Sequence, residues 1–235
     1  MPKSVMHATR AGQPLQPVGR RRFLQVASVA TASTALLISG CNKDDDTPSA
    51  ATVDLGSGDV GVLNYAYALE QLEAAFYAQI IATPYTGISA EEQAYFTSIA
   101  KHEAIHRDFF KAAITAAAPG NIIGSLTPDF SSVTFTDRSS VLSTAKTFED
   151  LGVAAYNGAG KLLKNTDYLL LAGKIVSVEA RHAAVIRDLI NNGDFAADDV
   201  VDASTGLDKA MSVDEVLMAA QAFIKEKITA TNVGK

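Results

Sequence analysis

The chain has 235 residues and a formal net charge of −6. Its first 40 residues hold five of the 20 Lys and Arg side chains and none of the 26 Asp and Glu side chains, so the rest carries a net charge of −11. So acidic a sequence offers no cluster of Lys and Arg side chains to bind phosphates, which argues against nucleic acid as a partner. The remaining residues suit one domain with a real core, and their Ala, Leu, Ile and Val content is typical of packed helices.

Residues 1–40 have the composition of an export signal. Arg20–Arg22 precede Phe23–Leu24, and a mildly apolar run follows to Ile38, too short and too polar for a confident membrane span. The run from Arg20 to Leu24 resembles a twin-arginine signal, and the four residues ending at Cys41 resemble a bacterial lipobox. These resemblances imply export of a folded protein and lipidation of Cys41; a simple peptidase site or a buried free thiol is the alternative.

The chain is therefore expected to be a lipoprotein of the cell envelope, held to the lipid membrane by an acyl anchor on Cys41 and facing the periplasm or the exterior. Cys41 is the only cysteine, so no internal disulfide can form. Residues 41–58 are rich in Asp, Ser, Thr, Pro and Gly and are predicted to be a flexible tether. A bundle domain is predicted over 59–192 and a C-terminal extension over 193–235.

Four long segments with helical periodicity follow the tether. They are predicted over about 59–82, 89–118, 137–163 and 168–191. The prolines beyond the tether all fall between these segments, and Ser89 with Glu92 forms a capping-box pattern at the start of the second. A shorter amphipathic helix is predicted over about 213–227; its apolar face would suit either a cap on the bundle or a partner surface.

The lengths of the connections predict the topology. About six residues join the first two helices and about four join the last two, so each pair forms an antiparallel hairpin. A 25-residue helix is about 37 Å long, and the 18 residues of 119–136 reach about 60 Å when extended. The predicted fold is therefore all-α: a ferritin-like four-helix bundle with two antiparallel hairpins and one long crossover, plus the short C-terminal helix.

Two Glu-x-x-His pairs are the main chemical signal. Glu103 precedes His106, and Glu179 precedes His182. Residues three apart share one face of a helix, so each pair is expected to bind one metal ion. Oxygen-rich ligands with two imidazoles and no thiolate favour Fe or Mn over a structural zinc site.

Each pair lies roughly 30 residues after another glutamate in an apolar segment, Glu70 for the first and Glu149 for the second. Four buried carboxylates would repel one another and shift their pKa values strongly, whereas two divalent ions would supply a compensating +4. The sequence therefore predicts two divalent metal ions bound by six side chains, namely Glu70, Glu103, His106, Glu149, Glu179 and His182.

Four further residue types accompany this pattern. Tyr77 and Tyr156 each follow a predicted ligand by seven residues, so they share its helix face and are candidates for bonding a ligand carboxylate or lining an oxidant pocket. Glu73 lies one turn after Glu70 and is an alternative ligand. His102 points about 100° away from Glu103, which favours a surface or supporting role. The glycines of the third helix predict close packing or a local distortion.

These motifs resemble the ferritin-like superfamily, and within it the bacterial desiccation-related group. The resemblance covers all four bundle helices and is carried by LNYAYALEQLEAAFY, KHEAIHRDFF, TFEDLGVAAYNGA and SVEARHAAVIRDLI. It implies a di-metal oxidoreductase of the peroxidase, catalase or ferroxidase kind that reacts with H₂O₂ or O₂ in stress protection. Iron oxidation and storage is one alternative; a non-catalytic envelope scaffold with a structural metal is another. The sequence is compatible with a homo-oligomer.

Overall fold

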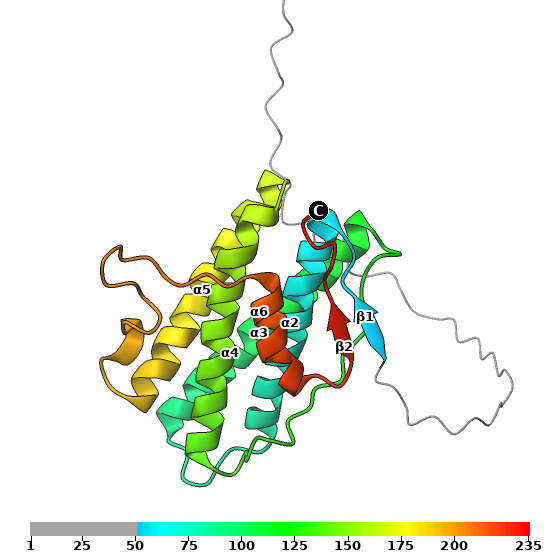
Figure 1. Ribbon diagram of the computed structural model, residues 1–235. Coiled ribbons are helices and arrows are strands. Elements are labelled where there is room, and N and C mark those ends of the chain that lie inside the picture. Colours follow the sequence, from blue (N-terminus) through cyan, green and yellow to red (C-terminus); the bar gives the residue numbers. More distant parts are fainter. Residues whose placement is uncertain (1–50) are drawn as a thin grey trace, which may run out of the picture. The chain divides into compact units, whose positions relative to one another are not determined.

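Four long helices dominate the computed structural model, which describes residues 51–235 (Figure 1). The export signal and Cys41 lie outside the described residues. The elements are β1 (Thr52–Asp54), α2 (Gly58–Ala82), α3 (Ala90–Ala117), α4 (Arg138–Ala159), α5 (Thr166–Ile190), α6 (Val213–Ala220) and β2 (Lys227–Thr229). Short 3₁₀ turns follow α4, α5 and α6. No helix of residues 51–235 has the length and apolar character needed to cross a membrane.

The helices begin where local hydrogen bonding favours it. At α3, the Ser89 hydroxyl accepts from the backbone N–H of Glu92, and the Glu92 carboxylate accepts from the N–H of Ser89. This is the capping box predicted from the sequence. At α4, the Asp137 carboxylate accepts from the N–H of Ser140. The four predicted bundle helices are confirmed, and their ends fall within a few residues of the expected positions.

The helices pack as two pairs, α2 with α3 and α4 with α5, joined by the long crossover between α3 and α4. The crossover is attached to α2 by two buried amides. Asn64 donates to the carbonyl of Asn121 and accepts from the N–H of Ile123. Gln71, seven residues later on the same face, accepts from the N–H of Leu126. These bonds pair backbone groups of an irregular segment, including the N–H of the buried Ile123, which would otherwise lack a partner.

The prediction that residues 41–58 form a flexible tether is wrong for its last part. Thr52–Asp54 form β1, which pairs in parallel with β2 near the C-terminus (Figure 1). Leu55 is fully buried, and its carbonyl accepts from the Asn64 amide. The pairing is non-local, so the polar composition of this stretch did not reveal it.

The C-terminal helix was predicted to reach Lys227, but α6 ends at Ala220 and one 3₁₀ turn follows it. The Gln221 amide donates to the carbonyls of Ile224 and Glu226 and accepts from the N–H of Ile228. These bonds and the pairing with β1 replace the last two helical turns. Of the two roles left open for this helix, the structure shows the first: α6 packs on α4 and buries Val216 and Ala220.

A charged cluster that the sequence did not predict attaches the segment after α5. The Arg187 side chain is 1% exposed and bonds the carboxylates of Asp150 on α4 and Asp199 in the following loop. Asp194 lies 3.5 Å from the same guanidinium group. A buried guanidinium needs such partners, because the cost of removing it from water is otherwise uncompensated.

Close packing explains a glycine of α4. A Cβ atom on Gly158 would lie 1.7 Å from the carbonyl oxygen of Met211, in the segment that leads into α6. The N–H of Met211 also donates to the carbonyl of Ala154, one turn earlier in α4. The segment before α6 therefore touches the α4 backbone directly, which only glycine permits at this position.

We expect Gly158→Ala to lower the free energy of unfolding by about 1–3 kcal/mol or more, because the added methyl group must separate Met211 from α4. Gly160→Ala is the matched control: its nearest atom would be Leu169 Cδ1 at 3.5 Å, and its effect should range from neutral to about 1 kcal/mol of stabilisation. Urea unfolding of both variants measures the difference. Equal stabilities would show that the backbone contact does not restrict position 158.

Candidate metal centre

Six buried ionisable side chains meet inside the bundle, and each long helix contributes at least one. They are Glu70 from α2, Glu103 and His106 from α3, Glu149 from α4, and Glu179 and His182 from α5. These are the six side chains predicted from the sequence. Their atoms form two groups of possible metal ligands, and within each group the ligand atoms lie within 4.8 Å of one another.

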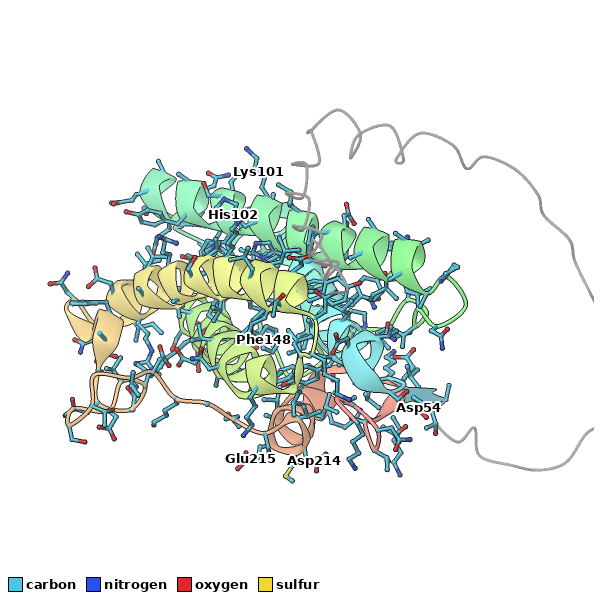
Figure 2. All side chains as sticks on the ribbon, turned by 90° about the horizontal axis from the view of Figure 1, so that it is seen from above. Asp54, Lys101, His102, Phe148, Asp214 and Glu215 are labelled. Atoms are coloured by element: carbon cyan, nitrogen blue, oxygen red, sulfur yellow. The ribbon has the colours of Figure 1, made fainter. Side chains whose placement is uncertain are left out.

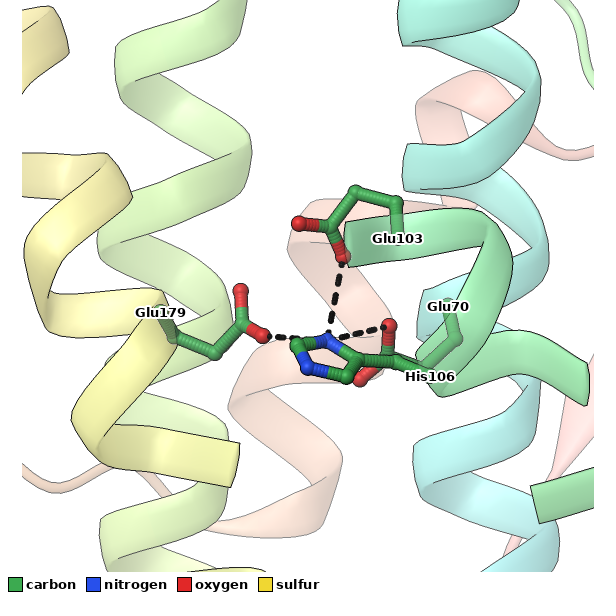
Figure 3. A group of neighbouring side chains, drawn as sticks. All are labelled: Glu70, Glu103, His106 and Glu179. Carbon is green, nitrogen blue, oxygen red and sulfur yellow. Dashed lines mark ion pairs between the residues drawn. The ribbon is translucent and has the colours of Figure 1, made fainter. Parts of the chain in front are cut away.

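The first group surrounds His106 (Figure 3). Its Nδ1 atom lies 2.8 Å from Glu179 Oε1, 3.5 Å from Glu70 Oε2 and 3.6 Å from Glu103 Oε2. Three carboxylate oxygens and one imidazole nitrogen thus face one small space. This is a donor set suited to a divalent ion such as Fe²⁺ or Mn²⁺.

The second group repeats the first around His182. Its Nδ1 atom lies 2.8 Å from Glu103 Oε1, 3.5 Å from Glu149 Oε2 and 3.6 Å from Glu179 Oε2. The two hairpins therefore place equivalent atoms at nearly equal distances. The centre has a local twofold symmetry that exchanges α2 with α4 and α3 with α5.

Glu103 and Glu179 belong to both groups. The sequence had suggested that each Glu-x-x-His pair would serve its own ion. In the structure each of these glutamates is closer to the histidine of the other pair, 2.8 Å against 3.6 Å. Helical spacing showed that a glutamate and a histidine share a face, but only the packing of α3 against α5 sets which ions the glutamate can reach. The geometry gives Glu103 and Glu179 bridging positions and leaves Glu70 and Glu149 at the two ends.

The hydrogen-bonding state of these atoms fits two metal ions. Within residues 51–235, ten buried side-chain nitrogen or oxygen atoms have no hydrogen-bond partner, and eight of them belong to the six side chains. The eight are Nδ1 of both histidines, both oxygens of Glu103 and Glu179, and Oε2 of Glu70 and Glu149. Several of them lie as close as 2.8 Å to one another, in the contacts between each histidine and its neighbouring glutamates. Unpartnered buried polar atoms are costly, and here they form two complete sets of four metal donors.

Without metal, charge is distributed unevenly over the centre. Burial opposes protonation of both imidazoles, but the surrounding carboxylates outweigh it and raise the pKa values of His106 and His182 to about 12. Burial would raise the pKa of Glu103, yet its two histidine neighbours lower it to about 2. For Glu149 burial prevails and the pKa rises to about 8. The metal-free centre thus compensates part of its negative charge with imidazolium protons.

Two tyrosines link the two helix pairs by hydrogen bonds to glutamates of the centre. Tyr77 on α2 donates a hydrogen bond to Glu149 on α4, and Tyr156 on α4 donates to Glu70 on α2. Each phenol bonds Oε1, so Oε2 of the same glutamate remains free to face the metal position. The seven-residue spacing had placed each tyrosine on the helix face of its own glutamate, and the partner is instead the equivalent glutamate of the opposite helix. Such bonds would orient Glu70 and Glu149 as terminal ligands of a bound ion.

Glu73 and His102 are the two residues whose roles the sequence left open. Glu73 is 4% exposed but belongs to neither ligand group. Its burial and the negative charge of Glu179 raise its pKa well above the usual range. His102 lies at the exposed surface of α3 (Figure 2), and its Nδ1 atom is 2.8 Å from Nε2 of His182. The geometry therefore gives His102 a supporting contact with a ligand, as expected.

An apolar cavity of about 40 Å³ is lined by residues of all four long helices. Its wall includes Leu69, Phe110 and Tyr156. Tyr65 of α2 also lines it, and the hydroxyl of Tyr65 is buried without a hydrogen-bond partner. The space is sufficient for roughly three water-sized molecules. Tyr156 therefore both lines this cavity and donates a hydrogen bond to Glu70.

The fold and the site define a four-helix bundle with a carboxylate-rich centre able to hold metal ions. The family model of the ferritin-like domain matches residues 58–192, so the chain belongs to the ferritin-like domain family. This range runs from the first residue of α2 to just beyond α5 and contains all six side chains. A search of curated proteins found no match to the chain.

We expect metal loading at pH 7 to release at least two protons per chain. His106 and His182, with pKa values raised to about 12, are protonated in the metal-free protein and must each lose a proton before Nδ1 can bind. Apparent affinity should therefore increase as the pH rises. Calorimetric titration with Mn²⁺ in buffers of different ionisation enthalpy measures the protons released, and heats independent of the buffer would contradict this prediction.

Proposed function

We propose that this chain is a redox protein of the cell envelope whose centre binds two Fe or two Mn ions and reacts with H₂O₂ or O₂, protecting the cell under oxidative or desiccation stress. One observation carries the proposal: eight unpartnered buried donor atoms form two symmetric sets of four. An iron or manganese pair, when bound, would supply electrons to H₂O₂ or O₂, and a second H₂O₂ or another external electron donor would reduce it again.

The side chains have separable tasks in this proposal. Glu103 and Glu179 would hold the two ions at a fixed separation, because each reaches both ligand groups. Tyr77 and Tyr156 hold the terminal glutamates in place through hydrogen bonds. The burial of all six ligands keeps bulk water from the centre, and the cavity beside Tyr156 offers room for a small oxidant.

The envelope location rests on the start of the sequence. The arginines at 20–22, the apolar run after them and Cys41 support export in a folded state followed by lipid anchoring. Folding before export would let the metal be chosen in the compartment of synthesis. This matters because the relative affinities of divalent ions otherwise favour the wrong metal at an oxygen- and nitrogen-rich site.

Protein purified from its native envelope is expected to contain two Fe or two Mn per chain by elemental analysis, and its optical spectrum should change on addition of H₂O₂ or O₂. Glu179→Gln should lower metal content below two, because this side chain belongs to both groups. Glu91→Gln is the control, since it makes the same chemical change at an exposed position.

Each contrary result has its own meaning. Zinc alone, or metal without any response to peroxide or O₂, would replace the redox proposal with a scaffold in which metal is structural. Two iron ions per chain in a large closed assembly that accumulates further iron would instead favour storage. Sizing chromatography of the same preparation separates that outcome from the proposal.

Tyr77→Phe and Tyr156→Phe should each weaken metal binding by about 10–100-fold, because the terminal glutamate loses the phenol that orients it. Competition with a chelator measures the change. Tyr95→Phe is the control, since its hydroxyl bonds the exposed Glu91, which precedes Glu103 by 12 residues and belongs to neither ligand group. If the tyrosines also contact the oxidant, peroxide consumption should fall further than metal occupancy explains. Unchanged affinity and turnover in both variants would remove the tyrosines from the site.

A further inference from the structure

The local twofold symmetry of the centre is broken at one position. Glu70 and Glu149 are equivalent, as are the tyrosines seven residues after each. Three residues after the same glutamates, however, α2 carries Glu73 and α4 carries Gly152. One half of the centre therefore has an additional carboxylate where the other half has no side chain.

Gly152 makes room for Glu73. A Cβ atom at position 152 would lie 3.1 Å from Glu73 Oε1 and 3.9 Å from Glu179 Oε2. Both oxygens thus border position 152, so the Glu73 carboxylate lies next to a residue that belongs to both ligand groups. A side chain of any size at position 152 would press against it, which gives a physical reason for glycine in the interior of a helix.

The fold does not explain why Glu73 is buried. Within residues 51–235 it forms no hydrogen bond or ion pair. Its burial raises its pKa, and the negative charges of the four glutamates of the centre raise it further. A void of about 10 Å³ lies beside it, lined by Leu69, Leu72, Phe148, Leu151 and Gly152. This is at the lower limit for one water molecule, so the void supplies no ready hydrogen-bond partner for the carboxylate.

We propose that Glu73 is a seventh, facultative ligand that moves onto the metal pair when the pair carries more charge than the other carboxylates balance. The proposal rests on the two-metal centre proposed above. Four glutamates neutralise two divalent ions, whereas one divalent and one trivalent ion carry one further positive charge. In a buried site this charge requires a nearby anion, and Glu73 is the adjacent carboxylate outside the six-ligand set.

Equilibrium binding of two redox-silent probes tests this inference without relying on turnover. Mn²⁺ in the absence of O₂ represents the divalent state, and Ga³⁺, supplied as its nitrilotriacetate complex beside one Mn²⁺, represents the trivalent ion. Glu73→Gln keeps the shape of the side chain and removes its charge. We expect it to retain two Mn²⁺ with affinity within about threefold, and to bind Ga³⁺ about 10–100-fold more weakly.

Gly152→Ala provides a second, independent variant, because the new methyl group would lie 3.1 Å from Glu73 Oε1 and displace the carboxylate. It should weaken Ga³⁺ binding in the same direction. Glu91→Gln and Gly173→Ala are the matched controls: Glu91 is exposed, and a Cβ on Gly173 of α5 would meet no atom within 4 Å. Both should bind the two probes as the unmodified protein does. Thermal unfolding of each variant verifies that it is folded.

Unchanged Ga³⁺ affinity in Glu73→Gln and Gly152→Ala would overturn the inference while leaving the two-metal centre intact. An equal loss of Mn²⁺ and Ga³⁺ would also overturn it, because Glu73 would then support the site irrespective of charge. If the unmodified protein fails to bind two Mn²⁺, both the inference and the proposed function fail. A selective loss of Ga³⁺ supports both.

Discussion

The structure depends on the electrostatics of four glutamates that face one another inside a helical bundle. Such a group is unstable unless positive charge accompanies it. In the metal-free protein, His106 and His182 supply part of that charge as imidazolium ions, and their raised pKa values reflect the balance. Two divalent ions would occupy the same spaces and satisfy the eight donor atoms that lack partners. The negative charge of the four glutamates can therefore be compensated by imidazolium protons in the metal-free protein or by two divalent ions in a metal-loaded one.

Much of the surrounding structure serves to keep these carboxylates in place. Tyr77 and Tyr156 each donate a hydrogen bond to a glutamate of the opposite hairpin. Each half of the bundle thus fixes the position of a candidate ligand in the other half. Asn64 and Gln71 fasten the crossover to α2, the helix that carries Glu70. Arg187, five residues after His182 on α5, joins that helix to α4 through Asp150. The polar groups of the interior thus connect elements whose apolar faces alone would allow more than one alignment.

Most of the bundle could be predicted from local patterns. Periodicity and capping residues located α2–α5, and the lengths of the loops indicated two hairpins and a crossover. The six side chains of the centre were also predictable, because a repeated Glu and Glu-x-x-His pattern is uncommon and helical spacing is regular. Prediction failed where long-range contacts override local preference. Residues 52–54 and 227–229 become strands only by pairing with each other, although they are far apart in the sequence. The Arg187 cluster also joins residues that are distant in sequence.

The sequence by itself determined which residues meet on each helix face, since spacing along a helix decides this regardless of context. It therefore predicted the six candidate ligands and the net charge that two divalent ions would have to match. Only the tertiary structure decided the relations between helices: that Glu103 and Glu179 reach both groups, that each tyrosine serves the opposite glutamate, and that Gly152 leaves room for Glu73. These relations depend on the distance and rotation of one helix against another, which packing sets and local sequence does not encode.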